Sequence, residues 1–208
     1  MLRCYASLPG CGDPVEFCYK HPIRPVQVRW EFEQLVSIIR DLQPSTAMEI
    51  GTHNGGTLYP LCRLAEPHAT IISLDLPKGA FGGGYHPLKL PIYKRFATPS
   101  QKLHFVRSDS HAETTLIKIE NLLAGRKLDY LFIDGDHSYQ GVKQDFEMYS
   151  SLVRSGGVIV FHDVAEHERA QDCQVSKFWQ QVKSHYRHQE FIENPAQGWA
   201  GIGVLYFD

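Results

Sequence analysis

The chain of 208 residues, 43% of them hydrophobic and 12% aromatic, is long enough for one domain with a substantial core and too short for a comfortable second domain. Its formal net charge of -2 provides no broad basic field, which excludes nucleic acid and membrane surfaces as general partners and favours a small-molecule substrate. No apolar run could cross a bilayer and Met1–Tyr5 begins no export signal, so we expect a soluble, cytoplasmic protein whose five cysteines are reduced.

Residues 1–25 are expected to form an irregular arm, because prolines and glycines deny this segment a long helix. Three cysteines and a histidine of the arm could bind zinc, although the seven-residue spacing of the cysteines matches no compact zinc knuckle. These four residues are Cys4, Cys11, Cys18 and His21. The alternative is an arm that folds across the domain as part of a lid, with its thiols buried.

From residue 26 to residue 208 we expect a single domain in which helices and strands alternate. Apolar residues at helical spacing predict a helix over 26–42. Strands are predicted at 47–50, 70–75, 103–107, 128–133, 157–161, 187–192 and 201–207, and further helices at 56–65, 112–124, 139–152 and 175–184. This alternation predicts a parallel sheet with helices on both faces, joined by right-handed crossovers.

Residues 76–100 interrupt the alternation and are too long for a simple connector, so we expect a mobile flap over a site, with Gly82–Gly84 as its flexible part. Its aromatic residues could form the wall of a substrate pocket or only pack the flap against the domain, and we favour packing. They are Phe81, Tyr85, Tyr93 and Phe96, together with Trp199 near the C-terminus.

A glycine-rich turn follows the first strand, with the pattern E-x-G-x-x-x-G-G from Glu49 to Gly56. Gly51 permits a sharp turn, and Gly55 and Gly56 would let a ligand approach the first amides of the next helix. A carboxylate at this position can bind hydroxyls or an amino group but would repel a dinucleotide pyrophosphate. Asp75, which ends the second strand, could accept hydrogen bonds from both hydroxyls of a ribose or only cap a turn.

The next two strand ends carry more polar groups. Asp109, Ser110 and His111 could frame an adenine edge, cap the following helix, or do both. The fourth strand is followed by Asp134, Asp136 and His137, the densest chemical cluster in the chain, and the fifth by His162 and Asp163. Neighbouring strand ends would bring these carboxylates together, where a divalent cation such as Mg2+ would relieve their repulsion.

Such a cation would also lower the pKa of a bound hydroxyl, leaving His137 to take its proton as the catalytic base, with Asp134 beside it. The metal ligands would come from Asp134, Asp136, His162 and Asp163. The structural alternative is that Asp134 and Asp163 cap turns and His137 bonds to the backbone.

In chain order these motifs resemble those of the class I S-adenosylmethionine-dependent methyltransferases, from residue 26 to the C-terminus. Residues 49–57 (EIGTHNGGT) look like the first motif, which holds the methionine part of the cofactor; Asp75 matches the ribose-binding acid, and residues 109–111 fall where adenine contacts are found. Residues 133–142 (IDGDHSYQGV) and 152–163 (LVRSGGVIVFHD) are similar to a bacterial subgroup of cephalosporin-hydroxylase-like and macrolide-sugar O-methyltransferases.

The resemblance implies a Rossmann-like α/β fold, with a seven-stranded, mostly parallel sheet, helices on both faces and an antiparallel C-terminal strand. It implies S-adenosylmethionine as cofactor, bound by Glu49, Gly51, Thr52, Asn54, Gly55, Gly56, Asp75, Asp109, Ser110, His111 and Asp134. In metal-dependent relatives an Asp after the fourth strand and an acidic pair after the fifth bind Mg2+. Here His162 replaces one acid, so the metal would be softer than Mg2+, or His162 would contact the acceptor instead.

The expected reaction is therefore O-methylation of a hydroxyl on a small molecule of sugar or natural-product type, assisted by a divalent cation. Two alternatives belong to other classes. A non-catalytic nucleoside-binding domain would not need the cluster at 134–137, and a metal-dependent hydroxylase or hydrolase would not need the cofactor residues. The sequence leaves open the acceptor, whether a metal is required, and whether the chain forms a homo-oligomer.

Overall fold

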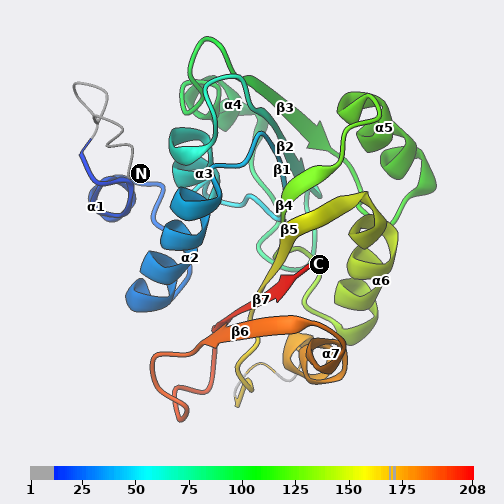
Figure 1. Ribbon diagram of the computed structural model, residues 1–208. Helices are drawn as coiled ribbons and strands as arrows, with labels where there is room; N and C mark the ends of the chain where they lie inside the picture. The colour runs from blue at the N-terminus through cyan, green and yellow to red at the C-terminus, as the bar shows by residue number, and fades with distance from the viewer. Residues whose placement is uncertain (1–11, 169, 171) are drawn as a thin grey trace, which may run out of the picture.

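A computed structural model describes residues 12–168, 170 and 172–208 (Figure 1). Its strands are β1 Thr46–Ile50, β2 Thr70–Asp75, β3 Lys102–Arg107, β4 Leu128–Ile133, β5 Val153–His162, β6 Arg187–Phe191 and β7 Ile202–Tyr206. Its helices are α1 Pro14–Lys20, α2 Arg29–Leu42, α3 Leu58–Leu64, α4 Leu90–Tyr93, α5 Glu113–Leu123, α6 Tyr139–Tyr149 and α7 Val175–Val182, with 3-10 turns at Pro87–Lys89, Ser150–Leu152 and Lys183–His185.

The strands form one sheet in the order β3-β2-β1-β4-β5-β7-β6. β1 to β5 pair in parallel, whereas β7 runs antiparallel to both β5 and β6. The predicted α/β fold with a mostly parallel seven-stranded sheet and an antiparallel C-terminal strand is confirmed. Most predicted bounds shift by one to three residues, but β5 begins four residues early, because Val153 already pairs with Leu128 across an irregularity in the register.

Helices cover both faces of the sheet. Figure 1 shows α1, α2 and α3 on one side and α5, α6 and α7 on the other. Every residue of β1, β2 and β4 is buried, as expected for parallel strands that lie between two helical layers. Within the described residues, no helix is both long enough and apolar enough to cross a membrane.

The arm is not irregular throughout, since α1 occupies Pro14–Lys20. The prediction failed here because proline is well tolerated in the first turn of a helix, where its missing N–H has no partner to lose, and because the Asp13 side chain caps that turn by accepting from the Val15 amide at 3.0 Å. Cys18 is buried and its Sγ donates to the Gly56 carbonyl at 3.4 Å, as expected for a lid. Cys4 and Cys11 of the zinc alternative lie outside the described residues.

The flap at 76–100 packs down on the domain. Tyr85, Tyr93 and Phe96 are at most 5% exposed and belong to the core on the α1–α3 side of the sheet. The preference for packing over a pocket wall is therefore confirmed for these three aromatic residues, whereas Trp199 stays 41% exposed.

Candidate active site

The site begins where β1 turns away from the sheet at Gly51. Its φ is +91°, and a Cβ there would lie 1.9 Å from the Asp134 carbonyl oxygen, so only glycine fits. The Gly51 amide donates to the Leu74 carbonyl at 2.9 Å, and the Asp134 amide donates to the Ile50 carbonyl at 2.9 Å. The ends of β1, β2 and β4 are thereby joined, and Asp134 lies directly beside the glycine turn.

Gly55 and Gly56 lie against neighbouring segments of the chain, which the sequence did not predict. A Cβ on Gly55 would lie 2.9 Å from the Tyr93 ring, and one on Gly56 would lie 2.7 Å from the backbone of Ile23 and of Pro25. The two glycines thus make room for the flap and the arm. A pocket nevertheless lies between the turn and the arm, lined by residues 24–27, 51–54, 56 and 57 and by Asp134.

Glu49 lies beneath the turn and is only 1% exposed. Its Oε1 accepts from the Thr52 hydroxyl at 2.5 Å, and that hydroxyl lies 2.6 Å from Ser73 Oγ. Burial raises the pKa of Glu49 to about 8, although the hydrogen bond from Thr52 lowers it in part. The predicted cofactor carboxylate therefore carries a proton at neutral pH and supports the turn from below.

Asp75 is 7% exposed and holds the turn and the flap together. Its Oδ2 accepts from the backbone amides of Thr52 at 3.2 Å, His53 at 2.9 Å and Tyr85 at 3.3 Å. Burial raises the pKa of Asp75, while these three amides act in the opposite direction. The Oδ1 atom lies outside this set of contacts and is the oxygen that could meet a ribose.

Three further contacts bring the flap over the turn. Tyr93 Oη donates to the His53 carbonyl at 2.9 Å, and Lys89 Nζ donates to Asn54 Oδ1 at 2.9 Å. The Phe81 ring stacks on His137, with 4.9 Å between centroids and 14° between planes. The predicted flap thus covers both the glycine turn and the histidine of the fourth strand end.

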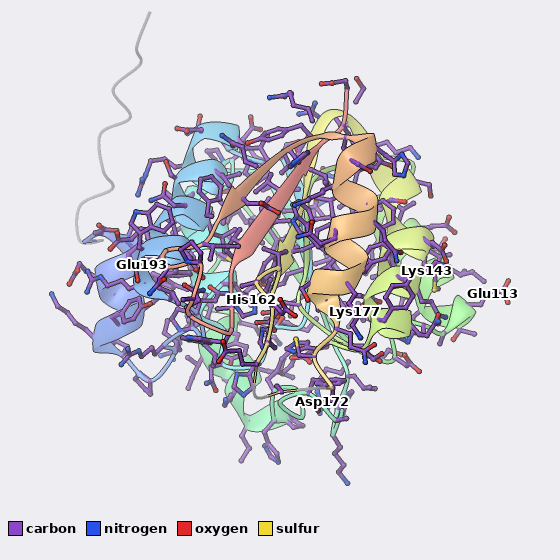
Figure 2. The ribbon with its side chains drawn as sticks, turned by 90° about the horizontal axis from the view of Figure 1, so that it is seen from below. Glu113, Lys143, His162, Asp172, Lys177 and Glu193 are labelled. Atoms are coloured by element: carbon purple, nitrogen blue, oxygen red, sulfur yellow. The ribbon has the colours of Figure 1, made fainter. Side chains whose placement is uncertain are left out.

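Four of the predicted side chains gather at the ends of β4 and β5. His162 Nδ1 lies 3.1 Å from Asp134 Oδ1 and 3.4 Å from Asp163 Oδ1. His137 lies 3.4 Å from Asp134 through Nε2 and 3.1 Å from Asp163 through Nδ1. Figure 2 shows His162 near the centre of the molecule, whereas Glu113, Lys143 and Glu193 lie at the periphery. Asp163 has a φ of +61°, an uncommon conformation for this residue type that aims its carboxylate into the cluster.

Two carboxylates and two imidazoles balance one another in this cluster. Burial alone would lower the pKa of His137, but the hydrogen bond to Asp134 and the charge of Asp163 raise it to about 10. The same carboxylates raise the pKa of His162 well above its ordinary value against the effect of its burial. Burial would raise the pKa of Asp163, but the neighbouring His162 holds that pKa well below its ordinary value. Burial would also raise the pKa of Asp134, but His162 and His137 together lower it. Both imidazoles therefore hold protons while no other cation is present.

The residues fit a divalent cation in two overlapping ways. Ligand atoms of Asp134, His162 and Asp163 all lie within 4.8 Å of one another, and so do those of His137, Asp163 and Cys173. His162 Nε2 is buried without a hydrogen-bond partner in the part of the chain that the structure describes. A mixed oxygen and nitrogen ligand set suits transition metals better than Mg2+.

Asp136 does not join these groups, contrary to the prediction. Its Oδ1 accepts from the Ser138 amide at 2.9 Å, and its carboxylate lies against Gly141 in the first turn of α6. Asp136 follows Asp134 by two residues, but its carboxylate faces the start of α6, whereas that of Asp134 faces His137 and His162.

The predicted adenine contacts lie at the end of β3. Asp109 Oδ1 accepts from the His111 amide at 2.9 Å, and the Ser110 carbonyl accepts from Tyr149 Oη at 2.7 Å. His111 Nε2 lies 3.2 Å from Asp145, a fully buried carboxylate of α6 that raises the pKa of this imidazole. Ser110 and His111 therefore contact α6, and the role of residues 109–111 toward an adenine stays a prediction.

Three contributing residues were not found from the sequence. Asp145 holds His111, Cys173 lies beside His137, and His167 Nε2 lies 3.0 Å from Asp163 Oδ1. Asp145 could have been noticed as a carboxylate inside the apolar pattern of a helix. No local pattern marks Cys173 or His167, which come from the loop between β5 and α7.

The chain belongs to the methyltransferase domain family, whose model matches residues 48–164. An uncharacterised protein of Acanthamoeba polyphaga mimivirus is 34% identical over 122 residues, which are 59% of this chain and 52% of that protein. An uncharacterised protein of Sinorhizobium fredii is 29% identical over 135 residues, 62% of this chain and 14% of that protein. The matches thus span about half, or much less, of these relatives' length.

In three dimensions the chain is similar to the O-methyltransferase TomG of Streptomyces achromogenes, involved in tomaymycin synthesis and solved with S-adenosylmethionine (TM-score 0.63, 15% identity, 95% of this chain and 91% of that one). An O-methyltransferase of Bacillus cereus in complex with S-adenosylhomocysteine is similar as well (TM-score 0.65, 17% identity, 96% and 93%). At these identities the likeness establishes a shared fold.

The resemblance to class I S-adenosylmethionine-dependent methyltransferases is therefore confirmed in family, as a methyltransferase domain, and in fold. The match to a methyltransferase domain gives no support to the two alternatives, a non-catalytic nucleoside-binding domain and a metal-dependent hydroxylase or hydrolase. The closer likeness to the cephalosporin-hydroxylase-like subgroup stays a prediction.

The protonated Glu49 leads to a test of the turn's stability. Its pKa of about 8 in the folded protein exceeds the ordinary value of 4.5, so between these values the folded state binds the extra proton and stability falls as pH rises. Glu49→Gln keeps an oxygen that can accept from Thr52. We expect its free energy of unfolding to equal that of the wild type at about pH 5 and to exceed it by roughly 2–4 kcal/mol at about pH 9.

Urea unfolding at the two pH values measures this difference. Glu120→Gln, at an exposed position on α5, is the control and should show no such gain at alkaline pH. A Glu49→Gln variant that is equally destabilised at both values would contradict a protonated carboxyl beneath the turn.

Proposed function

We propose that the enzyme transfers a methyl group from S-adenosylmethionine to a hydroxyl oxygen of a small molecule. The observation that carries this proposal is that one residue, Asp134, both lines the pocket at the glycine turn and contacts His137 at 3.4 Å. A hydroxyl must lose its proton as it takes the methyl group, which requires a base beside the donor, whereas an amine often needs none. Alignment of the two substrates would supply much of the remaining acceleration.

The cofactor is proposed to extend along the carboxyl ends of β1, β2 and β3, as ligands do in open α/β sheets. Its methionine part would contact the turn formed by Gly51, Thr52, Asn54, Gly55 and Gly56, with Glu49 beneath it; its ribose would contact Asp75, and its adenine would lie near Asp109, Ser110 and His111. The donor and product bound in the two similar O-methyltransferase structures support this choice of cofactor.

For the acceptor we propose a hydroxylated molecule of sugar or natural-product type. A second pocket beside the cluster, with a volume of about 400 Å³, is lined by Glu166, His167, Cys173, Gln174, Ser176 and Lys177. Its polar lining suits a ligand with several hydroxyls. The role of TomG in tomaymycin synthesis shows that this fold serves natural-product chemistry.

A divalent cation held by Asp134, His162 and Asp163 is the second part of the proposal. When bound, such a cation acidifies a coordinated hydroxyl and neutralises nearby carboxylates. This matters for His137, because with a pKa of about 10 it holds its proton at neutral pH and only its neutral form accepts one. We therefore expect the base role of His137 to depend on whatever offsets the charge of the two carboxylates.

The reaction is tested by incubating the enzyme with methyl-labelled S-adenosylmethionine and a panel of sugar and phenolic hydroxyls, with matched amines for comparison. His137→Gln should lower turnover by about 10²–10⁴-fold while cofactor affinity, measured by calorimetry, is retained. Asp75→Ala should lose cofactor binding, and His68→Gln, at an exposed position, should change neither. Methyl transfer to the amines alone, or no binding of the cofactor, would refute the proposal.

The metal is tested by removing it. After chelation, turnover should fall and return when Mn2+, Co2+ or Mg2+ is added, while binding of the demethylated cofactor persists. Asp163→Asn should abolish the metal response, whereas Asp136→Asn should keep it, because Asp136 faces α6. If an effective chelator leaves turnover unchanged, the proposal that a metal assists the reaction is refuted, whereas the proposal of methyl transfer is unaffected.

A further inference from the structure

Gln27, in the segment between the arm and α2, has an unusual environment. The residue is 7% exposed, and its side-chain Oε1 is buried without a hydrogen-bond donor among the residues that the structure describes. Buried polar atoms are paired in most folded proteins, because burial removes the water that would otherwise satisfy them. An unpaired amide oxygen therefore indicates a donor that the described part of the chain does not supply.

The oxygen belongs to a residue that lines the pocket between the glycine turn and the arm. Gly56 fixes this part of the arm, since the backbone of Ile23 and Pro25 lies where a Cβ on Gly56 would be. The Cys18 thiol donates to the Gly56 carbonyl, and Tyr19 Oη donates to the Gln27 carbonyl at 3.4 Å. The backbone that carries Gln27 is thus held against the turn, and its side chain is positioned in advance of any ligand.

The missing donor can be assigned from the chemistry of the methionine part of the cofactor. That part ends in a carboxylate and an ammonium group, and an ammonium has three N–H donors and no acceptor. Glu49, the acid expected from the sequence to meet an amino group, lies beneath the turn with Oε1 bonded to Thr52 and its carboxyl protonated by burial. Gln27, in contrast, is one of the residues that line the pocket, and its Oε1 has no bonded partner among the described residues.

We propose that Gln27 binds the α-ammonium group of S-adenosylmethionine through its side-chain oxygen and so selects a cofactor that carries an amino acid end. This inference rests on the proposed function, because it uses the same pocket for the same cofactor. It makes the segment before α2, and not only the glycine turn, part of the cofactor site.

The test compares two ligands by titration calorimetry with the full chain: S-adenosylhomocysteine, which has the amino acid end, and 5′-methylthioadenosine, which lacks it. Gln27→Met has a side chain of similar volume without the acceptor oxygen. It should lower the affinity for S-adenosylhomocysteine by about tenfold and leave the affinity for methylthioadenosine unchanged. Gln27→Glu restores an acceptor and should bind S-adenosylhomocysteine at least as well as the wild type. Gln180→Met, at an exposed position on α7, is the matched control and should change the affinity for neither ligand.

Equal affinity of Gln27→Met and the wild type for S-adenosylhomocysteine would overturn the inference, and so would an equal loss for both ligands, because a merely structural role weakens both. Failure of Gln27→Glu to recover the affinity lost in a folded Gln27→Met protein would also count against it. If the wild type binds neither ligand, the proposed function fails, and the inference fails with it.

Discussion

The approach of Gly51 to the Asp134 carbonyl oxygen is the contact on which the site depends. Gly51 ends β1 and Asp134 follows β4, and no Cβ could fit between them. Because Gly51 has no side chain, the glycine turn lies against Asp134, a residue that lines the pocket at the turn and also contacts His137. The geometry explains how a turn near residue 51 and a cluster some 80 residues later can serve one reaction, since methyl transfer requires donor and acceptor to meet end to end.

The second constraint is electrostatic. Asp134 and Asp163 are too close to share a buried region without a compensating charge, and in the ligand-free protein His137 and His162 supply it by keeping their protons. The same arrangement that stabilises the cluster thus prevents His137 from acting as a base. A cation bound by the two carboxylates would replace the protons of the histidines as the compensating charge, and would so leave His137 free to accept a proton. His162, which stands where metal-dependent relatives carry an acid, supplies part of that compensating charge when no cation is bound.

Alternation of apolar strands and helices was enough to predict the sheet, and polar residues at strand ends were enough to bring Asp75, Asp134, His162 and Asp163 to one edge of it. The sequence failed where a residue's partner comes from elsewhere in the chain. It could not show that Gly56 accommodates Pro25, that Asp136 turns toward α6, or that the loop after β5 adds His167 and Cys173. Those outcomes depend on packing between distant segments, which leaves no local pattern.

In the proposed complex the donor lies along the strand ends with its reactive sulfur facing Asp134 and His137. A crystal structure of the protein with S-adenosylhomocysteine would reveal this placement. We predict ribose hydroxyls on Asp75 Oδ1, adenine beside Asp109–His111, and sulfur between the glycine turn and the cluster at the ends of β4 and β5. A nucleoside bound elsewhere, or a sulfur directed away from Asp134 and His137, would contradict it.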